Sequence, residues 1–145
     1  MKKDKRLSRC TALQILYSSE ISENLPSDSF DFICKQFTEE AYTDKVKKYS
    51  LLLVKHTLKN IIYLDELICK KSKNWEIGRI AMIDTIILRM AIAEMLFIED
   101  TPLKVSIAEA IEIAKIFSTN DSGRFVNGIL DAIYQDIKKD KMVVK

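Results

Sequence analysis

Apolar residues in the last third of the chain recur at the spacing of an α-helix, and they do so twice in succession. The first stripe consists of Val105, Ile107, Ala108, Ile111, Ala114 and Phe117, and the second of Val126, Ile129, Leu130, Ile133 and Ile137. At 100° per residue, each set covers one side of a helix. A short polar segment, residues 118–122, separates the two stripes. The sequence therefore predicts two amphipathic helices that form a helical hairpin.

The ends of these helices carry capping signals. Ser106 and Glu109 have the spacing of a capping box, in which the hydroxyl accepts from a first-turn amide and the carboxylate reaches back to the cap. Pro102 lies just upstream and offers an alternative start for the same helix. Asn120 and Asp121 precede the second stripe, and either side chain could accept from the free amides there. We expect one of these two residues to be the N-cap.

Two of the three glycines of the chain, Gly123 and Gly128, fall inside the second predicted helix. A glycine within a helix costs about 1 kcal/mol relative to alanine. Two of them in one helix indicate that something approaches it closely, which could be a neighbouring helix or the backbone of a ligand.

The composition favours an all-α fold. Only two prolines and three glycines occur in 145 residues, too few for the turns of a β-rich protein. Upstream of the hairpin, apolar periodicity predicts further helices over residues 4–21, about 30–37, 44–68, about 75–80 and 83–97. We expect a single domain, a compact bundle of about seven helices in two subdomains, of about residues 1–73 and 74–145.

Several classes of protein are disfavoured. The single histidine, His56, excludes a Ser-His-Asp triad and paired-histidine metal sites, and the chain has no glycine-rich phosphate-binding loop. We therefore expect no enzymatic activity, no cofactor and no metal. The three cysteines (Cys10, Cys34 and Cys69) are widely spaced in apolar stripes, which indicates reduced, buried thiols. No apolar run is long enough for a membrane span, and we expect a cytoplasmic protein.

Positive charge is concentrated at both ends of the chain, although the net charge is only +2. The N-terminal group consists of Lys2, Lys3, Lys5, Arg6 and Arg9, and the C-terminal group of Lys138, Lys139, Lys141 and Lys145. Cations at a helix N-terminus oppose the helix dipole. The N-terminal group therefore does not stabilise its own helix, which indicates a role in binding. Such a distribution fits an anion-binding surface, and it also fits ends that are merely soluble.

RNA binding requires cations for the phosphates and exposed rings for unstacked bases. Tyr17 lies two turns beyond Arg9, at the edge of the basic face or in the core. Phe125, beside Arg124, lies near the edge of the second apolar stripe, where its ring could contact a base or cap the core. A protein-interaction module without RNA binding is the alternative.

Three sets of residues resemble the NusB family of bacterial transcription antitermination factors. The most specific set is EAIEIAK at residues 109–115, followed by Asp121 and by FVNGILD at residues 125–131. The second set is Arg9, Ala12, Leu16 and Tyr17, and the third is Leu88, Arg89, Ala91 and Glu94. Together they cover nearly the whole chain. The opening is poorer in arginine than the family pattern, because lysine stands at position 5 and Leu7 interrupts the basic run.

The resemblance implies a NusB-like fold and a role in antitermination. Members of the family bind boxA-type single-stranded RNA in nascent ribosomal RNA transcripts. They do so with a small-subunit ribosomal protein in the NusE role, and the complex promotes read-through by RNA polymerase. NusB-like domains also precede the catalytic domain of some ribosomal RNA methyltransferases, which is a second implied relationship. A homodimer that hides the RNA surface is conceivable.

The resemblance also implies site residues. The predicted RNA-binding residues are Lys3, Lys5, Arg6, Arg9, Tyr17, Asp121, Arg124 and Phe125. Asp121 could instead be a helix cap with no role in RNA binding. The ribosomal protein is expected near Asp84 and Arg89. Arg89 and Glu94 could instead form structural ion pairs, with Glu109 or Lys115 as candidate partners.

Overall fold

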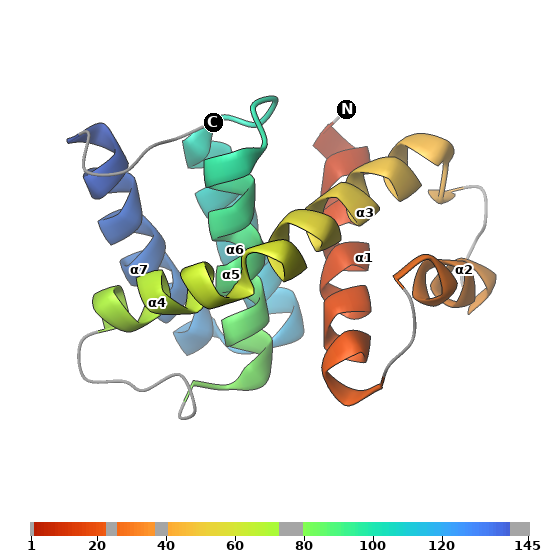
Figure 1. The fold of residues 1–145 in the computed structure, drawn as a ribbon, viewed down its shortest axis with the longest axis horizontal. Helices are drawn as coiled ribbons and strands as arrows, with labels where there is room; N and C mark the ends of the chain where they lie inside the picture. The colour runs from red at the N-terminus through yellow and green to blue at the C-terminus, as the bar shows by residue number, and fades with distance from the viewer. Residues whose placement is uncertain (1, 23–25, 37–40, 73–79, 140–145) are drawn as a thin grey trace. The chain divides into compact units, whose positions relative to one another are not determined.

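A computed structural model describes residues 2–22, 26–36, 41–72 and 80–139, and these residues contain seven α-helices and no strand. The helices are α1 Lys2–Ile21, α2 Pro26–Gln36, α3 Asp44–Lys59, α4 Ile61–Ser72, α5 Met82–Phe97, α6 Leu103–Phe117 and α7 Asn120–Lys138 (Figure 1). The predicted all-α class is confirmed. The short helical element predicted near residues 75–80 falls mostly on residues 73–79, which lie outside the described part of the chain. No helix in the described residues is both long enough and apolar enough to span a membrane.

The chain divides into two compact units, Met1–Lys55 and His56–Lys145. The dividing point lies within α3. The subdomain boundary expected near residue 73 stays a prediction.

In the first unit, hydroxyl groups tie α1 to α3. The Ser50 hydroxyl donates to the carbonyl oxygens of Ser8 (3.1 Å) and Val46 (2.7 Å), and the Ser8 hydroxyl lies 3.4 Å from the Val46 carbonyl. Both serines are buried, so these bonds satisfy groups that would otherwise be costly to remove from water. α1, α2 and α3 also contribute buried apolar residues to this unit, including Ala12, Leu13, Leu16, Phe30, Val46 and Leu53.

The long third helix predicted over residues 44–68 is two helices. α3 ends at Lys59 and α4 begins at Ile61. At the junction, the side-chain amide of Asn60 donates to the carbonyl oxygen of His56 (2.8 Å), an acceptor that a continuing helix would use for a backbone amide. The apolar stripe runs across both helices, so periodicity alone could not locate the break.

α5 is the centre of the second unit. Twelve of its sixteen residues are buried, and it packs against α4, α6 and α7. A helix that is apolar on all sides is stable only when neighbours surround it. Figure 1 shows α6 and α7 alongside it. The predicted helix at residues 83–97 is thus confirmed, with one more residue at its start.

The sequence offered two possible starts for α6, a capping box at Ser106 and Glu109 or a start at Pro102, and the structure has the second. The helix begins at Leu103 with Pro102 as N-cap, and the Ser106 hydroxyl donates to the buried carboxylate of Glu94 (2.7 Å). The capping box of Ser106 and Glu109 is therefore wrong, and the alternative start at Pro102 is correct. Ser106 serves a buried acceptor on α5, because leaving that carboxylate without a donor would cost more than leaving an exposed helix end to water.

The two glycines of α7 have different surroundings. A Cβ atom at Gly123 would lie 3.4 Å from Cγ of Lys115 and 3.6 Å from Cγ2 of Ile111, both on α6. At Gly128 a Cβ atom would meet nothing within 4 Å. The close approach of a helix is confirmed at Gly123, and at Gly128 no helix in the described residues comes near.

The predicted burial of all three cysteines is wrong for Cys69, which is exposed, and Cys10 is partly exposed. Neither of these two residues forms a disulfide bond. Cys69 lies near the C-terminal end of α4, where the stripe facing α5 uses Leu64, Leu67 and Ile68 instead. The side chain of Cys34 lies outside the described residues.

Candidate nucleic-acid interface

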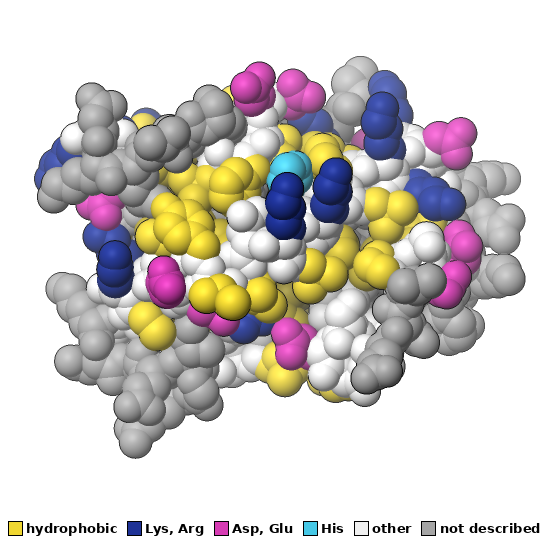
Figure 2. Space-filling view, in the orientation of Figure 1, with side chains coloured by type: hydrophobic (Ala, Val, Ile, Leu, Met, Phe, Trp, Pro, Cys, Tyr) yellow, Lys and Arg dark blue, Asp and Glu magenta, His cyan; other side chains and the backbone are white. Residues whose placement is uncertain are grey.

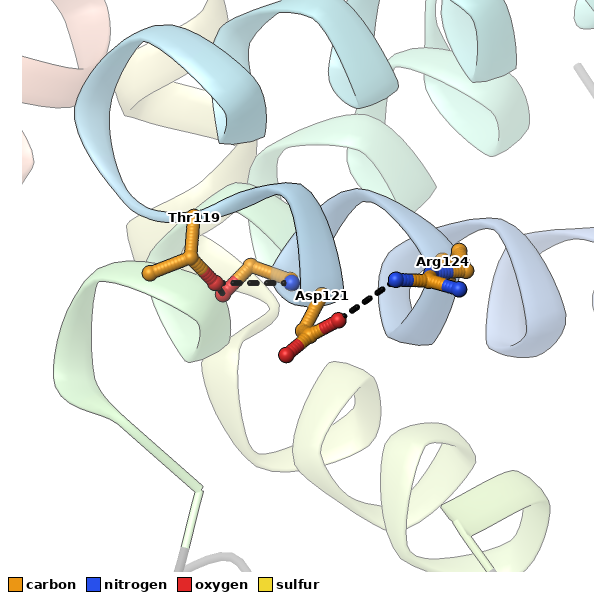
Figure 3. A network of polar contacts seen from close by, with 4 residues as sticks. Thr119, Asp121 and Arg124 are labelled. Carbon is orange, nitrogen blue, oxygen red and sulfur yellow. Dashed lines mark hydrogen bonds and ion pairs between the residues drawn. The ribbon is translucent and has the colours of Figure 1, made fainter.

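The α6–α7 corner is held by a cluster of hydroxyl groups. Thr119 is the N-cap of α7, and its Oγ1 accepts from the backbone amide of Ser122 (3.0 Å) (Figure 3). The Thr119 and Ser118 hydroxyls also lie 3.1 Å and 2.8 Å from Oγ of Ser122. The predicted caps, Asn120 and Asp121, are instead the first two residues of the helix. That prediction is wrong by one residue, because threonine can also accept from the amide three residues later.

A buried carboxylate anchors this corner to α5. The Ser122 hydroxyl donates to Oδ2 of Asp84 at 2.9 Å, and the two residues are 8% and 7% exposed. Asp84 lies in the first turn of α5, where negative charge is favoured by the helix dipole. Its other oxygen, Oδ1, is buried without a hydrogen-bond partner in the described part of the structure. Asp84 thus positions the start of α7, and its predicted role at a protein interface stays a prediction.

The first turn of α7 presents charged side chains to solvent. Nη2 of Arg124 donates to Oδ1 of Asp121 at 2.7 Å, and these side chains are 80% and 88% exposed (Figure 3). An exposed ion pair of this kind is weak, so either group can exchange its partner for a ligand. Phe125, the next residue, is half-buried. The structure therefore brings together three of the predicted RNA-binding residues on one helix.

α1 carries the other predicted RNA-binding residues. Lys5 and Arg6 are partly exposed, and Nζ of Lys5 lies 5.2 Å from the centre of the Tyr49 ring. Tyr17 is 38% exposed, which places its ring at the surface rather than in the core. Arg9 is only 3% exposed and is the least accessible of the set. The side chain of Lys3 lies outside the described residues.

On the face that Figure 2 shows, the described lysine and arginine side chains are scattered among apolar and acidic ones. Binding of a polyanion on this face would therefore depend on particular groups of residues.

Arg89 forms a bidentate ion pair inside the second unit. Its Nε and Nη2 atoms donate to the two carboxylate oxygens of Asp65, on α4, at 2.7 Å and 2.9 Å. The predicted structural ion pair is confirmed with a partner that the sequence did not reveal. Bidentate geometry adds directional specificity to this contact between α4 and α5. A contact of Arg89 with a protein partner stays a prediction.

Sequence reasoning missed Thr119, Ser122 and Asp65. Hydroxyl residues at a polar connector suit a capping role, which is the one signal that could have found Thr119. Ser122 and Asp65 carry no such signal, because their partners lie 38 and 24 residues away along the chain. Among the described residues, no group of three or more His, Cys, Asp or Glu side chains could hold a metal ion.

Comparison with known sequences gives a consistent result. Residues 6–135 match the NusB family. The transcription antitermination protein NusB of Chloroherpeton thalassium is 41% identical over 143 residues, covering 97% of this chain and 66% of the relative. The chain thus spans just under two thirds of that relative's length. The NusB protein of Pelotomaculum thermopropionicum is 37% identical over 141 residues, covering 97% of this chain and 96% of the relative.

Solved structures of similar fold include NusB proteins. T. maritima NusB superposes with a TM-score of 0.78 at 31% identity, covering 98% of both chains. A chain from a complex of the antitermination factors NusB and NusE with double-stranded RNA gives a TM-score of 0.80 at 24% identity, covering 93% of this chain and 98% of that one. At this lower identity the likeness shows the fold alone. The family match over residues 6–135, with relatives of 37–41% identity, shows that this chain belongs to the NusB family.

Proposed function

We propose that this chain is a transcription antitermination factor that binds boxA-type single-stranded RNA in nascent ribosomal RNA transcripts. In this role it acts with a small-subunit ribosomal protein, the NusE partner, and the assembly promotes read-through by RNA polymerase. The protein is a non-enzymatic, cytoplasmic adaptor. Membership of the NusB family is the observation that carries the proposal, and a NusB–NusE–RNA complex of the same fold supports it.

The α6–α7 corner supports the RNA-binding part of the proposal. Arg124 supplies an exposed cation that pairs with the exposed Asp121, and the half-buried Phe125 is the next residue along α7. A phosphate could replace Asp121 as the partner of Arg124, while an unstacked base contacts the ring. The buried Asp84–Ser122 bond holds this helix start in place before RNA arrives, which lowers the ordering cost of binding.

α1 supplies the second group of contacts. Lys5 and Arg6 are partly exposed cations, and Tyr17 carries an exposed ring about three turns further along the same helix. The RNA contacts Lys3, Lys5, Arg6 and Tyr17 on α1 and Arg124 and Phe125 on α7. Arg9 contributes mainly by supporting α1, because its guanidinium is buried.

The ribosomal protein docks on the second unit, near Asp84 and Arg89 at α5. Asp84 has a carboxylate oxygen that the described residues leave without a donor.

A binding titration tests the proposal. The protein, with and without the ribosomal partner, is titrated against boxA-like and scrambled RNA at two ionic strengths. We expect the complex to prefer the boxA-like RNA, and the affinity to fall with salt as counterions are released. Absence of a salt-dependent RNA interaction, even with the partner added, would favour a pure protein-interaction module. A parallel measurement of molecular mass shows whether a homodimer hides the RNA surface.

A further inference from the structure

A second cationic group lies at the opposite end of α7 from Arg124. Nζ of Lys104, on the first turn of α6, lies 5.9 Å from the centre of the Tyr134 ring, and Nζ of Lys138, on the last turn of α7, lies 5.6 Å from it. Both lysines are exposed and the tyrosine is half-buried. We call these three residues the Tyr134 cluster.

The cluster has an excess of positive charge. Within the described residues, neither lysine has a carboxylate within 4.0 Å, whereas Lys71 and Lys115 do. The Tyr134 ring attracts each ammonium group through its π-face, and it keeps both positive charges near one exposed end of the helix pair. An anion beside the ring would be attracted by both lysines.

Lys104 does not stabilise the helix in which it lies. A cation in the first turn of a helix opposes the dipole, and α6 has no side-chain N-cap to offset it. Lys138, in contrast, is favourably placed at a C-terminal turn. The stability of α6 therefore does not explain why a lysine stands at position 104.

The exposed face of α7 links the Tyr134 cluster to the corner at Arg124. Exposed positions follow one another at spacings of three and four along this helix, at residues 124, 128, 131, 135 and 138. Such spacing places them on one side of the helix. Gly128 lies in the middle of that side with open space where a Cβ atom would be, so a ligand backbone could pass close to the helix there.

Distances along α7 match a short length of RNA. From Phe125 to Tyr134 the helix rises about 14 Å, at about 1.5 Å per residue. A few nucleotides of single-stranded RNA cover that distance. Beyond Lys138 the sequence continues with three further lysines, Lys139, Lys141 and Lys145.

We propose that the Tyr134 cluster binds backbone phosphates of the same RNA that contacts the start of α7, and thus extends the RNA path along the whole helix. Tyr134 acts as a positioning residue that holds the two ammonium groups. Asp131, on the same face, tempers the affinity by repelling phosphate. The inference rests on the proposed RNA-binding function and adds the extent of the bound segment along α7.

The test is a salt titration with two RNAs, a boxA-like core and the same core extended by six nucleotides at each end. Affinity is measured by fluorescence anisotropy over a series of KCl concentrations. For the extended RNA, the double variant K104Q/K138Q should flatten the log–log salt slope by about 1.4, at about 0.7 per phosphate contact in single strands. The core alone should lose much less. The matched control, K55Q/K59Q, removes two exposed lysines of α3 and should leave both slopes unchanged.

Two further variants probe the ring and the carboxylate. Y134L should weaken binding of the extended RNA severalfold, whereas Y134F, which keeps the ring, should restore it. D131N should strengthen binding of the extended RNA. A K104Q/K138Q slope equal to that of the control would overturn the inference, and the proposed function would stand if R6A still flattened the slope. Failure of the unmodified chain and its partner to bind either RNA would refute both.

Discussion

Ser122 on α7 and Asp84 on α5 share a hydrogen bond of 2.9 Å although they are 38 residues apart in sequence, and both are more than nine-tenths buried. This bond fixes where α7 begins relative to the central helix of its unit. The side chains proposed to contact RNA follow immediately along α7. This buried bond thus positions the helix turn that presents Arg124 and Phe125.

The first prediction concerns this bond. S122A should lower the free energy of unfolding by about 1–3 kcal/mol, because a buried carboxylate oxygen loses its donor. Urea denaturation measures the change. S19A is the matched control, since the Ser19 hydroxyl bonds only the carbonyl of Ile15 on its own helix (3.1 Å), and it should change stability by less than about 0.5 kcal/mol. Equal changes in the free energy of unfolding for the two variants would show that the bond to Asp84 stabilises the fold no more than a local bond within one helix.

The second prediction locates the helix cap. T119A should cost about 1 kcal/mol, because Oγ1 of Thr119 accepts the free amide of Ser122. N120A should be nearly neutral, since Asn120 already lies inside the helix and is exposed. Thermal unfolding of both variants checks this order, and the reverse order would restore Asn120 as the cap.

The third prediction separates two arginines of α1. R6A should flatten the salt slope of RNA binding by about 1 and leave stability nearly unchanged, because Arg6 is partly exposed. R9A should mainly lower stability, since Arg9 is 3% exposed and its long side chain contributes packing as well as charge. Salt titrations and urea denaturation on the same two proteins provide both readouts. A slope change for R9A without loss of stability would place Arg9 on the RNA path after all.

The fourth prediction uses the exposed pair at the start of α7. D121N should strengthen RNA binding, because it removes a negative charge beside the proposed phosphate path and releases Arg124 from its 2.7 Å ion pair. Stability should change by less than about 0.5 kcal/mol, as expected for a surface site. Weaker binding by a correctly folded D121N protein would remove Asp121 and its neighbour from the path.

The fifth prediction concerns Gly128. G128A should raise the free energy of unfolding by up to about 1 kcal/mol, because alanine is the better helix former and the site has room for a methyl group. If RNA passes close to this face, the same methyl group should weaken RNA binding. G123A serves as the comparison, since its Cβ would contact Lys115 and Ile111 rather than a ligand. Unchanged RNA affinity in G128A would argue against a close approach there.

The apolar pattern of the sequence was sufficient to predict where most of the helices lie. Both stripes of the α6–α7 hairpin, and the nearly uniform apolar character of α5, predicted elements that the structure confirms within a few residues. Burial of apolar surface drives helix packing. The stripe predicted for α7 is buried throughout, but the stripe predicted for α6 is wrong, because Val105 and Ala108 are exposed and the buried face carries Ala110, Ile113 and Ala114. Apolar residues lie on several sides of α6, so their spacing did not determine which side is buried. The candidate RNA-binding cations and rings could likewise be proposed from residue type and position.

Tertiary structure decided the polar contacts and the helix ends. A hydroxyl such as that of Ser106 can cap its own helix or donate to a distant carboxylate, and only the position of Glu94 on α5 settles the choice. The same holds for Arg89, which has several acidic candidates in the sequence and pairs with Asp65 in the fold. Apolar burial is set by a local repeat, whereas a hydrogen bond is set by the distance and angle between two groups. That geometry exists only once the helices have packed.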